Sequence, residues 1–179
     1  SNPMPNRHAI LHDPNALEEE EAAWYRSVVG SLNYYACATR YDIAYPVSRL
    51  SQFASRPTVG AMKALRQVLT YLKCTADFSI SCRMSVEHDS LIAYSDSDHA
   101  GDNGLHTRSQ TAIMIMLNGA PVHWRSVKQV STAMSSACAE IDALSEAVKH
   151  ARLTLWRAEE LGVSAPGAIP MQVDNTQAI

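Results

Sequence analysis

The sequence predicts an α/β protein in which a mixed sheet with flanking helices follows a small helical module. Before residue 77, apolar side chains recur at spacings of three and four, which is the period of an amphipathic helix. Strand-like runs joined by the turn Asn118-Gly119 come next, and then a long amphipathic helix and a short apolar run. Strands combined with helices in this order indicate a mixed sheet covered by helices.

The length and composition fit one domain with a small module before it. The chain has 179 residues, of which 46% are hydrophobic and 18% are charged, as in an ordinary globular protein. Its formal net charge is −3. Affinity for a phosphate backbone comes largely from Lys and Arg, so any binding of nucleic acid requires local basic patches or a basic partner.

The sequence indicates neither a membrane protein nor a secreted one. Its longest purely apolar runs, such as residues 112–117, are far shorter than the ~20 residues of a membrane-spanning helix. No basic segment followed by an apolar one marks a signal peptide, so we expect a soluble intracellular protein. Disulfides are disfavoured there, and the cysteines form no zinc pattern. We therefore predict that four cysteines are small buried hydrophobic residues: Cys37, Cys74, Cys82 and Cys138.

Three segments are predicted along the chain. Residues 1–23 are expected to be a disordered tail or linker, because they hold three prolines, few large apolar side chains and an acidic run at 18–21. Residues 24–76 are expected to form a helical connection module, and residues 77–179 an α/β domain.

Each helix of the module is predicted from an apolar stripe or a capping residue. The first begins near Trp24, the second follows Asp42 as its cap, and the third follows Thr58 as its cap. The apolar positions that define the three stripes are Tyr25, Val28, Leu32, Tyr35, Ile43, Val47, Leu50, Phe53, Met62, Leu65, Leu69 and Leu72.

Strands are predicted after residue 77. Alternation of apolar and serine residues over 78–82 and the apolar run 91–94 indicate two strands, the second of which leads to Asp96. Residues 111–117 and 121–125 flank the Asn118-Gly119 turn, so they are expected to pair as a hairpin. The result is an antiparallel meander of about three strands.

A long helix and a short strand are predicted next. The helix carries apolar residues in steps of four and three from Ala137 to Leu155, and Gly162 is placed to end it. The apolar run 171–173 is expected to be a strand that ends at Asp174.

Three carboxylates, Asp96, Glu140 and Asp174, sit at the ends of these elements. Any one of them alone is most often a turn former or a helix-dipole residue. Together, at adjacent strand ends and in the first turn of a helix, they form an oxygen-ligand set suited to Mg²⁺. Two such ions about 4 Å apart would activate water and stabilise the leaving oxygen in phosphodiester hydrolysis.

Several stretches resemble the segment that follows the polymerase in copia-type retrotransposon reverse transcriptases. The most characteristic is Tyr94-Ser95-Asp96-Ser97-Asp98, and the similar stretches follow the family's order from Trp24 to the end of the chain. They are residues 25–32, 39–45, 64–73, 94–102, 108–109, 122–124, 128–129, 135–140, 143–147 and 173–175.

The resemblance implies a ribonuclease H-like fold that cleaves the RNA strand of RNA–DNA hybrids with Mg²⁺ or Mn²⁺ in a two-ion site. Asp96 matches the carboxylate that bridges both ions, whereas Glu140 and Asp174 match the ligands on the leaving-group side. Residues expected to contact nucleic acid are Arg108, Lys128 and Asn175.

The resemblance also implies partners and a location. The partners are the hybrid itself and the upstream polymerase and integrase portions of the polyprotein, and the location is a cytoplasmic virus-like particle or the nucleus. The paired aspartates of a Tyr-x-Asp-Asp polymerase motif are absent from the sequence, so nucleotide addition is not expected of this chain.

Departures from the family pattern leave two other functions open. Cys138 replaces a usual glutamate, His99 a usual tryptophan, and the sequence stops at Ile179 before the family's fourth acidic ligand. One alternative is an inactive, degenerate retroelement fragment that only binds nucleic acid. Hybrid binding without cleavage would indicate it. The other is a structural fragment that associates with itself or a partner through an uncovered core, which tight self-association without hybrid binding would indicate.

Overall fold

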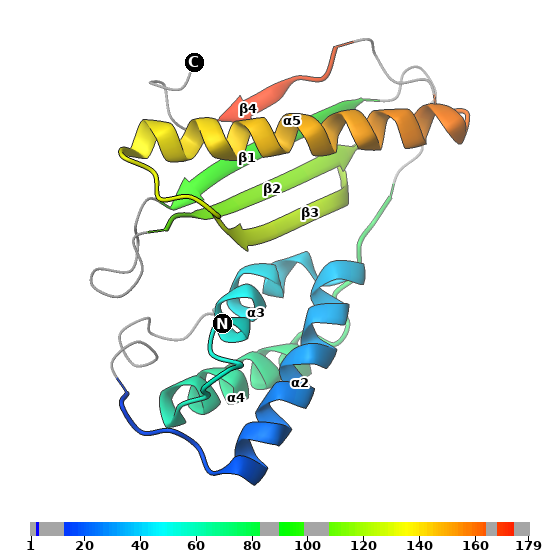
Figure 1. Ribbon diagram of the computed structural model, residues 1–179. Coiled ribbons are helices and arrows are strands. Elements are labelled where there is room, and N and C mark those ends of the chain that lie inside the picture. The colour runs from blue at the N-terminus through cyan, green and yellow to red at the C-terminus, as the bar shows by residue number, and fades with distance from the viewer. Residues whose placement is uncertain (1–2, 4–12, 83–89, 99–107, 164–167, 174–179) are drawn as a thin grey trace. The chain divides into compact units, whose positions relative to one another are not determined.

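The computed structural model describes residues 3, 13–82, 90–98, 108–163 and 168–173. The chain divides into two compact units, Ser1–Ser79 and Ile80–Ile179. The described part of the first unit is helical, whereas the second contains a four-stranded sheet and one long helix (Figure 1). The predicted α/β class with a mixed sheet and helices is therefore confirmed.

The first unit is built from α2 (Glu19–Ala38), the short 3-10 helix η1 (Tyr41–Ile43), α3 (Ala44–Ser51) and α4 (Val59–Cys74). Helix α2 packs against both α3 and α4. Seven of the apolar positions predicted from helical spacing are buried in this core: Tyr25, Leu32, Ile43, Val47, Leu50, Met62 and Leu65. The predicted Tyr35 is exposed instead, and the other buried residues are Val29, Ala36, Ala61, Ala64 and Val68.

The expectation that residues 1–23 form only a tail or linker is wrong for their last part. Helix α2 begins at Glu19, Ala22 is buried, and the Leu17 backbone N–H donates to the Pro57 carbonyl at 3.0 Å. Three glutamates occupy the first turn of α2, where the positive end of the helix dipole favours negative charge. The acidic run therefore starts a helix.

Capping in the first unit follows the sequence at Thr58 but not at Asp42. The Thr58 hydroxyl oxygen accepts a hydrogen bond from the Ala61 N–H at 3.2 Å at the start of α4, as predicted. Asp42 lies within η1 and accepts two hydrogen bonds from Arg40 at 2.8 and 2.9 Å. An ion pair thus replaces the expected cap.

The sheet of the second unit has the order β3-β2-β1-β4. Strands β1 (Leu91–Asp98), β2 (Gln110–Leu117) and β3 (Ala120–Lys128) form an antiparallel meander, and β4 (Met171–Val173) pairs in parallel with β1. The β2–β3 turn has positive φ at Asn118 (51°) and Gly119 (79°), as a two-residue hairpin turn of this kind requires. The predicted meander and hairpin are confirmed.

Helix α5 (Ser136–Glu160) packs on β1 and β2, and Figure 1 shows it running along the sheet. Its buried face consists mainly of alanines, which let the helix approach the strands closely. The predicted end at Gly162 is confirmed by a φ of +78°. The buried residues of this core are Leu91, Ala93, Ile113, Ile115, Ala147 and Ala151.

Two further expectations are wrong. Residues 78–82 are described but form no strand, and Phe78 is 63% exposed, because alternation alone stabilises no strand without a neighbour to supply backbone hydrogen bonds. All four cysteines are exposed instead of buried: Cys37, Cys74, Cys82 and Cys138. Within the described ranges, no helix is long and apolar enough to cross a membrane.

Candidate functional site

Asp96 lies on β1 near the strand's C-terminal end, and its side chain is exposed. Burial alternates along this strand, with Ala93 and Ser95 buried and Tyr94 and Asp96 exposed. Because successive strand residues point to opposite faces, the buried set faces α5, and the Asp96 carboxylate points to the other face, into solvent.

Glu140 lies in the second turn of α5 and is 6% exposed. The helix begins at Ser135, whose hydroxyl oxygen accepts a hydrogen bond from the Cys138 N–H at 3.1 Å. This cap forms although the glutamate of a capping box is replaced by Cys138. Glu140 follows Ala139, which is fully buried, so the backbone that carries the Glu140 side chain is packed against the rest of the unit.

Strand pairing brings the two described carboxylates to the same end of the sheet. Asp96 is flanked by Ser97, whose partner on β2 is Thr111. The Thr111 side chain is joined through Gln129 to the backbone of Ala139, the residue before Glu140. Asp96 and Glu140 thus lie toward the same end of the sheet, with Asp96 exposed on the face away from α5 and Glu140 buried on α5.

The third predicted carboxylate, Asp174, lies outside the described residues. The residue before it, Val173, ends β4 and pairs with Ser95 of β1, next to Asp96. Within the part of the chain that the structure describes, no group of three His, Cys, Asp or Glu side chains is placed to hold a metal ion. The described residues therefore do not test the full three-carboxylate set.

Buried hydroxyl groups surround this end of the sheet. Ser95 is 4% exposed and Ser109 is fully buried. Among the described residues, the hydroxyls of Ser95, Ser97 and Ser109 have no hydrogen-bond partner. A buried polar group without a partner costs about 1–3 kcal/mol, so these oxygens retain capacity for a further interaction.

The predicted nucleic-acid contacts are partly described. Arg108 is exposed just before β2, and Lys128 ends β3, paired with Gln110. Both therefore lie at the same end of the sheet as Asp96, whereas Asn175 is outside the described residues. Lys128 also borders a pocket of about 330 Å³ between β3 and α5, which Arg125 and Lys149 line as well.

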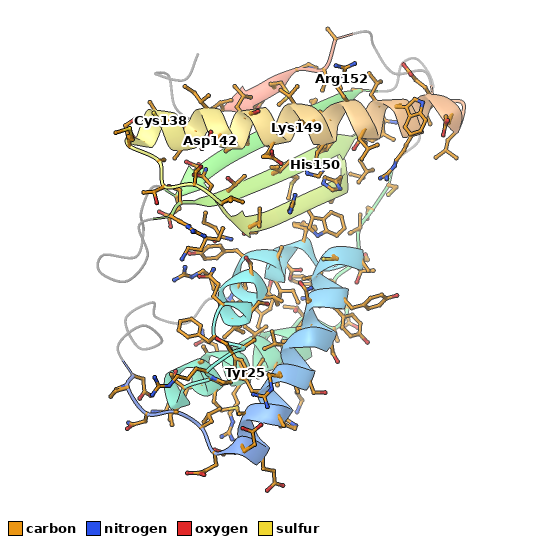
Figure 2. The ribbon with its side chains drawn as sticks, in the orientation of Figure 1. Tyr25, Cys138, Asp142, Lys149, His150 and Arg152 are labelled. Atoms are coloured by element: carbon orange, nitrogen blue, oxygen red, sulfur yellow. The ribbon has the colours of Figure 1, made fainter. Side chains whose placement is uncertain are left out.

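A pair of histidines between β3 and α5 was not predicted from the sequence. The rings of His123 and His150 stack with centroids 4.6 Å apart, and Arg125 Nη1 lies 3.3 Å from His150 Nε2. Burial, together with nearby positive charge, lowers the pKa of both rings. Figure 2 shows His150 on α5, well along the helix from Cys138 and Asp142. The histidine pair therefore packs at the middle of α5, away from the end that carries Glu140.

Gln129 is the second residue that sequence reasoning missed. It follows Lys128 in a stretch that resembles the family, but no role was assigned to it. The sequence does offer one signal for Gln129: it is a polar residue directly after a strand. A polar side chain at such a position needs hydrogen-bond partners if it is buried. Gln129 is 8% exposed and makes these contacts with Thr111 and Ala139.

The chain matches no protein-family model and no solved structure, but it is similar to several curated proteins. It is 36% identical over 154 residues to the Retrovirus-related Pol polyprotein from transposon RE1 of Arabidopsis thaliana, a match that covers 86% of this chain. It is 32% identical over 140 residues to the corresponding polyprotein from transposon TNT 1-94 of Nicotiana tabacum, covering 78% of this chain. The chain spans 10% of the length of each polyprotein.

A shorter relative is matched over most of its length. The chain is 42% identical over 127 residues to Secreted RxLR effector protein 161 of Plasmopara viticola. That match covers 71% of this chain and 88% of the relative.

Proposed function

We propose that the second unit of this chain, which belongs to the family of copia-type retrotransposon Pol polyproteins, is a ribonuclease H domain that hydrolyses the RNA strand of RNA–DNA hybrids. The observation that carries the proposal is the placement of Asp96 and Glu140 toward one end of a mixed sheet. The parallel pairing of β4 with β1 supports Asp174 as the third member, since β4 ends beside Ser95.

The described donor groups have the chemistry that a hard divalent cation prefers. Asp96 and Glu140 would hold Mg²⁺ or Mn²⁺ together with Asp174, and such ions prefer carboxylate and other oxygen ligands. The hydroxyl oxygens of Ser95 and Ser97, which lack partners among the described residues, add oxygen atoms to the same end. When bound, the ions would supply an activated water and stabilise the leaving oxygen.

The chain's own residues would orient the substrate. Arg108 and Lys128 lie at the same end of the sheet as the carboxylates, on the β2–β3 side of β1, and are suited to contact phosphates of the hybrid. Asn175 is proposed for the same role. Sugar and phosphate contacts of this kind recognise the shape of a hybrid and carry no base specificity.

Cleavage of a labelled RNA–DNA hybrid in Mg²⁺ or Mn²⁺ tests the proposal. We expect the chain to cut the RNA strand, and Asp96→Asn and Glu140→Gln each to lower the rate at least about a hundredfold, the scale on which loss of one essential catalytic group acts. Asp142→Asn is the matched control. It makes the same chemical change at an exposed position of α5 two residues after Glu140 (Figure 2), and it should leave the rate within about twofold.

Two outcomes would overturn the proposal. A folded chain that binds the hybrid but does not cut it would indicate the inactive nucleic-acid-binding fragment instead. Cleavage that survives Asp96→Asn unchanged would place the reaction elsewhere in the protein or in a contaminant.

A further inference from the structure

We infer that Gln129 is a positioning residue that holds the Glu140 carboxylate in the proposed metal site. The inference rests on the proposed function, because it assigns Glu140 a ligand's role. It adds a residue outside the carboxylate set, and it depends on contacts that the structure describes at the start of α5.

Both hydrogens of the Gln129 side-chain amide are used in hydrogen bonds. Nε2 donates to the Ala139 carbonyl of α5 at 2.9 Å and to the Thr111 hydroxyl of β2 at 3.0 Å. The Gln129 backbone N–H donates to the Ser109 carbonyl at 2.8 Å, which continues the β2–β3 ladder by one residue. With 8% of its surface exposed, the side chain is shielded from competing water.

The contact to Ala139 acts directly on Glu140. The Ala139 carbonyl belongs to the planar peptide unit that also contains the Glu140 nitrogen and Cα. Fixing that oxygen therefore restricts the position of the Glu140 backbone, from which the carboxylate projects. The other end of the link is Thr111, which pairs with Ser97, the neighbour of Asp96. One amide thus couples the strand pair that carries Asp96 to the helix turn that carries Glu140.

An uncharged amide of this length supplies both donors that the position uses. A glutamine offers two N–H donors on one nitrogen, which matches its two acceptors, Thr111 Oγ1 and Ala139 O. A glutamate there has no donor and adds negative charge beside Glu140. An asparagine is shorter by one methylene, so it would not span both acceptors without moving the helix.

The experiment compares Gln129→Met with Thr111→Val in the full chain. Gln129→Met keeps the side chain's length and removes both donated hydrogen bonds. Thr111→Val is the matched control, because it removes the other acceptor of the same amide, costs a buried hydrogen bond of similar strength, and leaves the link to Ala139. The probe is Mn²⁺, whose binding is followed by the loss of the free-ion electron paramagnetic resonance signal.

We expect Gln129→Met to weaken Mn²⁺ binding by about 10- to 100-fold, the usual effect of removing a group that orients a metal ligand. Thr111→Val should change it by less than about threefold. In the Glu140→Gln background, Gln129→Met should cause no further weakening, because the ligand through which it acts is already gone. Equal loss in both single variants, measured at equal thermal stability, would indicate a purely structural role and overturn the inference.

The outcomes separate this inference from the proposed function. If the wild-type chain binds Mn²⁺ and Gln129→Met binds it as tightly, the inference fails and the proposed site stands. If the folded wild-type chain binds no Mn²⁺ at millimolar concentration, the proposed site fails and this inference fails with it. Should Gln129→Met not fold, Gln129→Asn replaces it, because it stays uncharged and is too short to reach both acceptors. Amide hydrogen exchange at Glu140 is then the readout, with a loss of protection of about tenfold expected and unchanged protection counting against the inference.

Discussion

Replacing Arg40 tests how the helical unit is held together. Arg40 Nε and Nη2 donate to the two carboxylate oxygens of Asp42 at 2.9 and 2.8 Å. Its Nη1 and Nη2 also donate to the carbonyl and hydroxyl oxygens of Thr75, at 3.1 and 2.6 Å. The guanidinium lies 5.8 Å from the Tyr71 ring centroid and 5.9 Å from that of Phe78. Arg40 thus joins the segment after α2 to the end of α4.

The expected cost of Arg40→Met follows from these contacts. Removing one member of a buried ion pair costs about 3–5 kcal/mol, but the side chains of Arg40 and Asp42 are 12% and 21% exposed, so water relieves part of that loss. We expect about 2 kcal/mol for Arg40→Met and about 1 kcal/mol for Asp42→Asn. Their coupling in a double-mutant cycle should be about 1–2 kcal/mol.

The coupling should depend on pH in a defined direction. Burial raises the pKa of Asp42, but the hydrogen bonds from Arg40 and Tyr71 outweigh burial and lower it overall. A carboxyl group whose pKa is lower in the folded than in the unfolded state stabilises the fold. Its contribution is complete at pH values above the unfolded pKa of about 4 and is lost as the pH falls through the folded pKa. The coupling should therefore be complete at pH 7 and shrink in acid.

Urea denaturation followed by Trp24 fluorescence measures this coupling. Trp24 is the tryptophan of the first unit, so Trp124→Phe and Trp156→Phe in all chains leave a signal from that unit alone. A coupling below about 0.3 kcal/mol at pH 7, or one that is the same at pH 7 and in acid, would refute the reasoning.

Three further predictions concern other contacts. Tyr25→Phe should cost about 1 kcal/mol, because the buried Tyr25 hydroxyl donates to the Leu50 carbonyl at 2.8 Å; equilibrium unfolding in urea that matches wild type would contradict this. Gly119→Ala should cost about 1–2 kcal/mol, since its φ is +79°, and a calorimetric melting temperature that does not fall would argue against it. The pKa values of His123 and His150 are lowered by burial, so both favour the neutral form in the fold. Stability of the second unit should fall as the pH drops below about 6.5, and His123→Gln should weaken this dependence in melting curves recorded from pH 7.5 to 5.

Local signals predicted much of the fold. The Asn118-Gly119 turn, the caps at Thr58 and Ser135, and the end of α5 at Gly162 were readable because each depends on one or two residues and the backbone beside them. The apolar stripes of the helices were readable because burial on one face imposes a period of 3.6 residues.

Predictions failed where the outcome depended on distant partners. The alternating residues 78–82 form no strand, since a strand requires a neighbour that the pattern does not name. The cysteines are exposed, because a small side chain is buried or exposed according to where its element packs. Asp42 was expected to cap a helix but is held by Arg40, whose position depends on Thr75 of a different helix end.

For the candidate site, the sequence by itself determined which carboxylates stand at element ends, in what order, and which family carries them. Tertiary structure alone decided that Asp96 and Glu140 lie toward one end of the sheet, and that Gln129 links β2 to the start of α5. The physical reason is that residue types and spacing specify local backbone geometry. Residues 96, 129 and 140 come to the same end of the sheet only when strand register and the packing of α5 bring distant segments together.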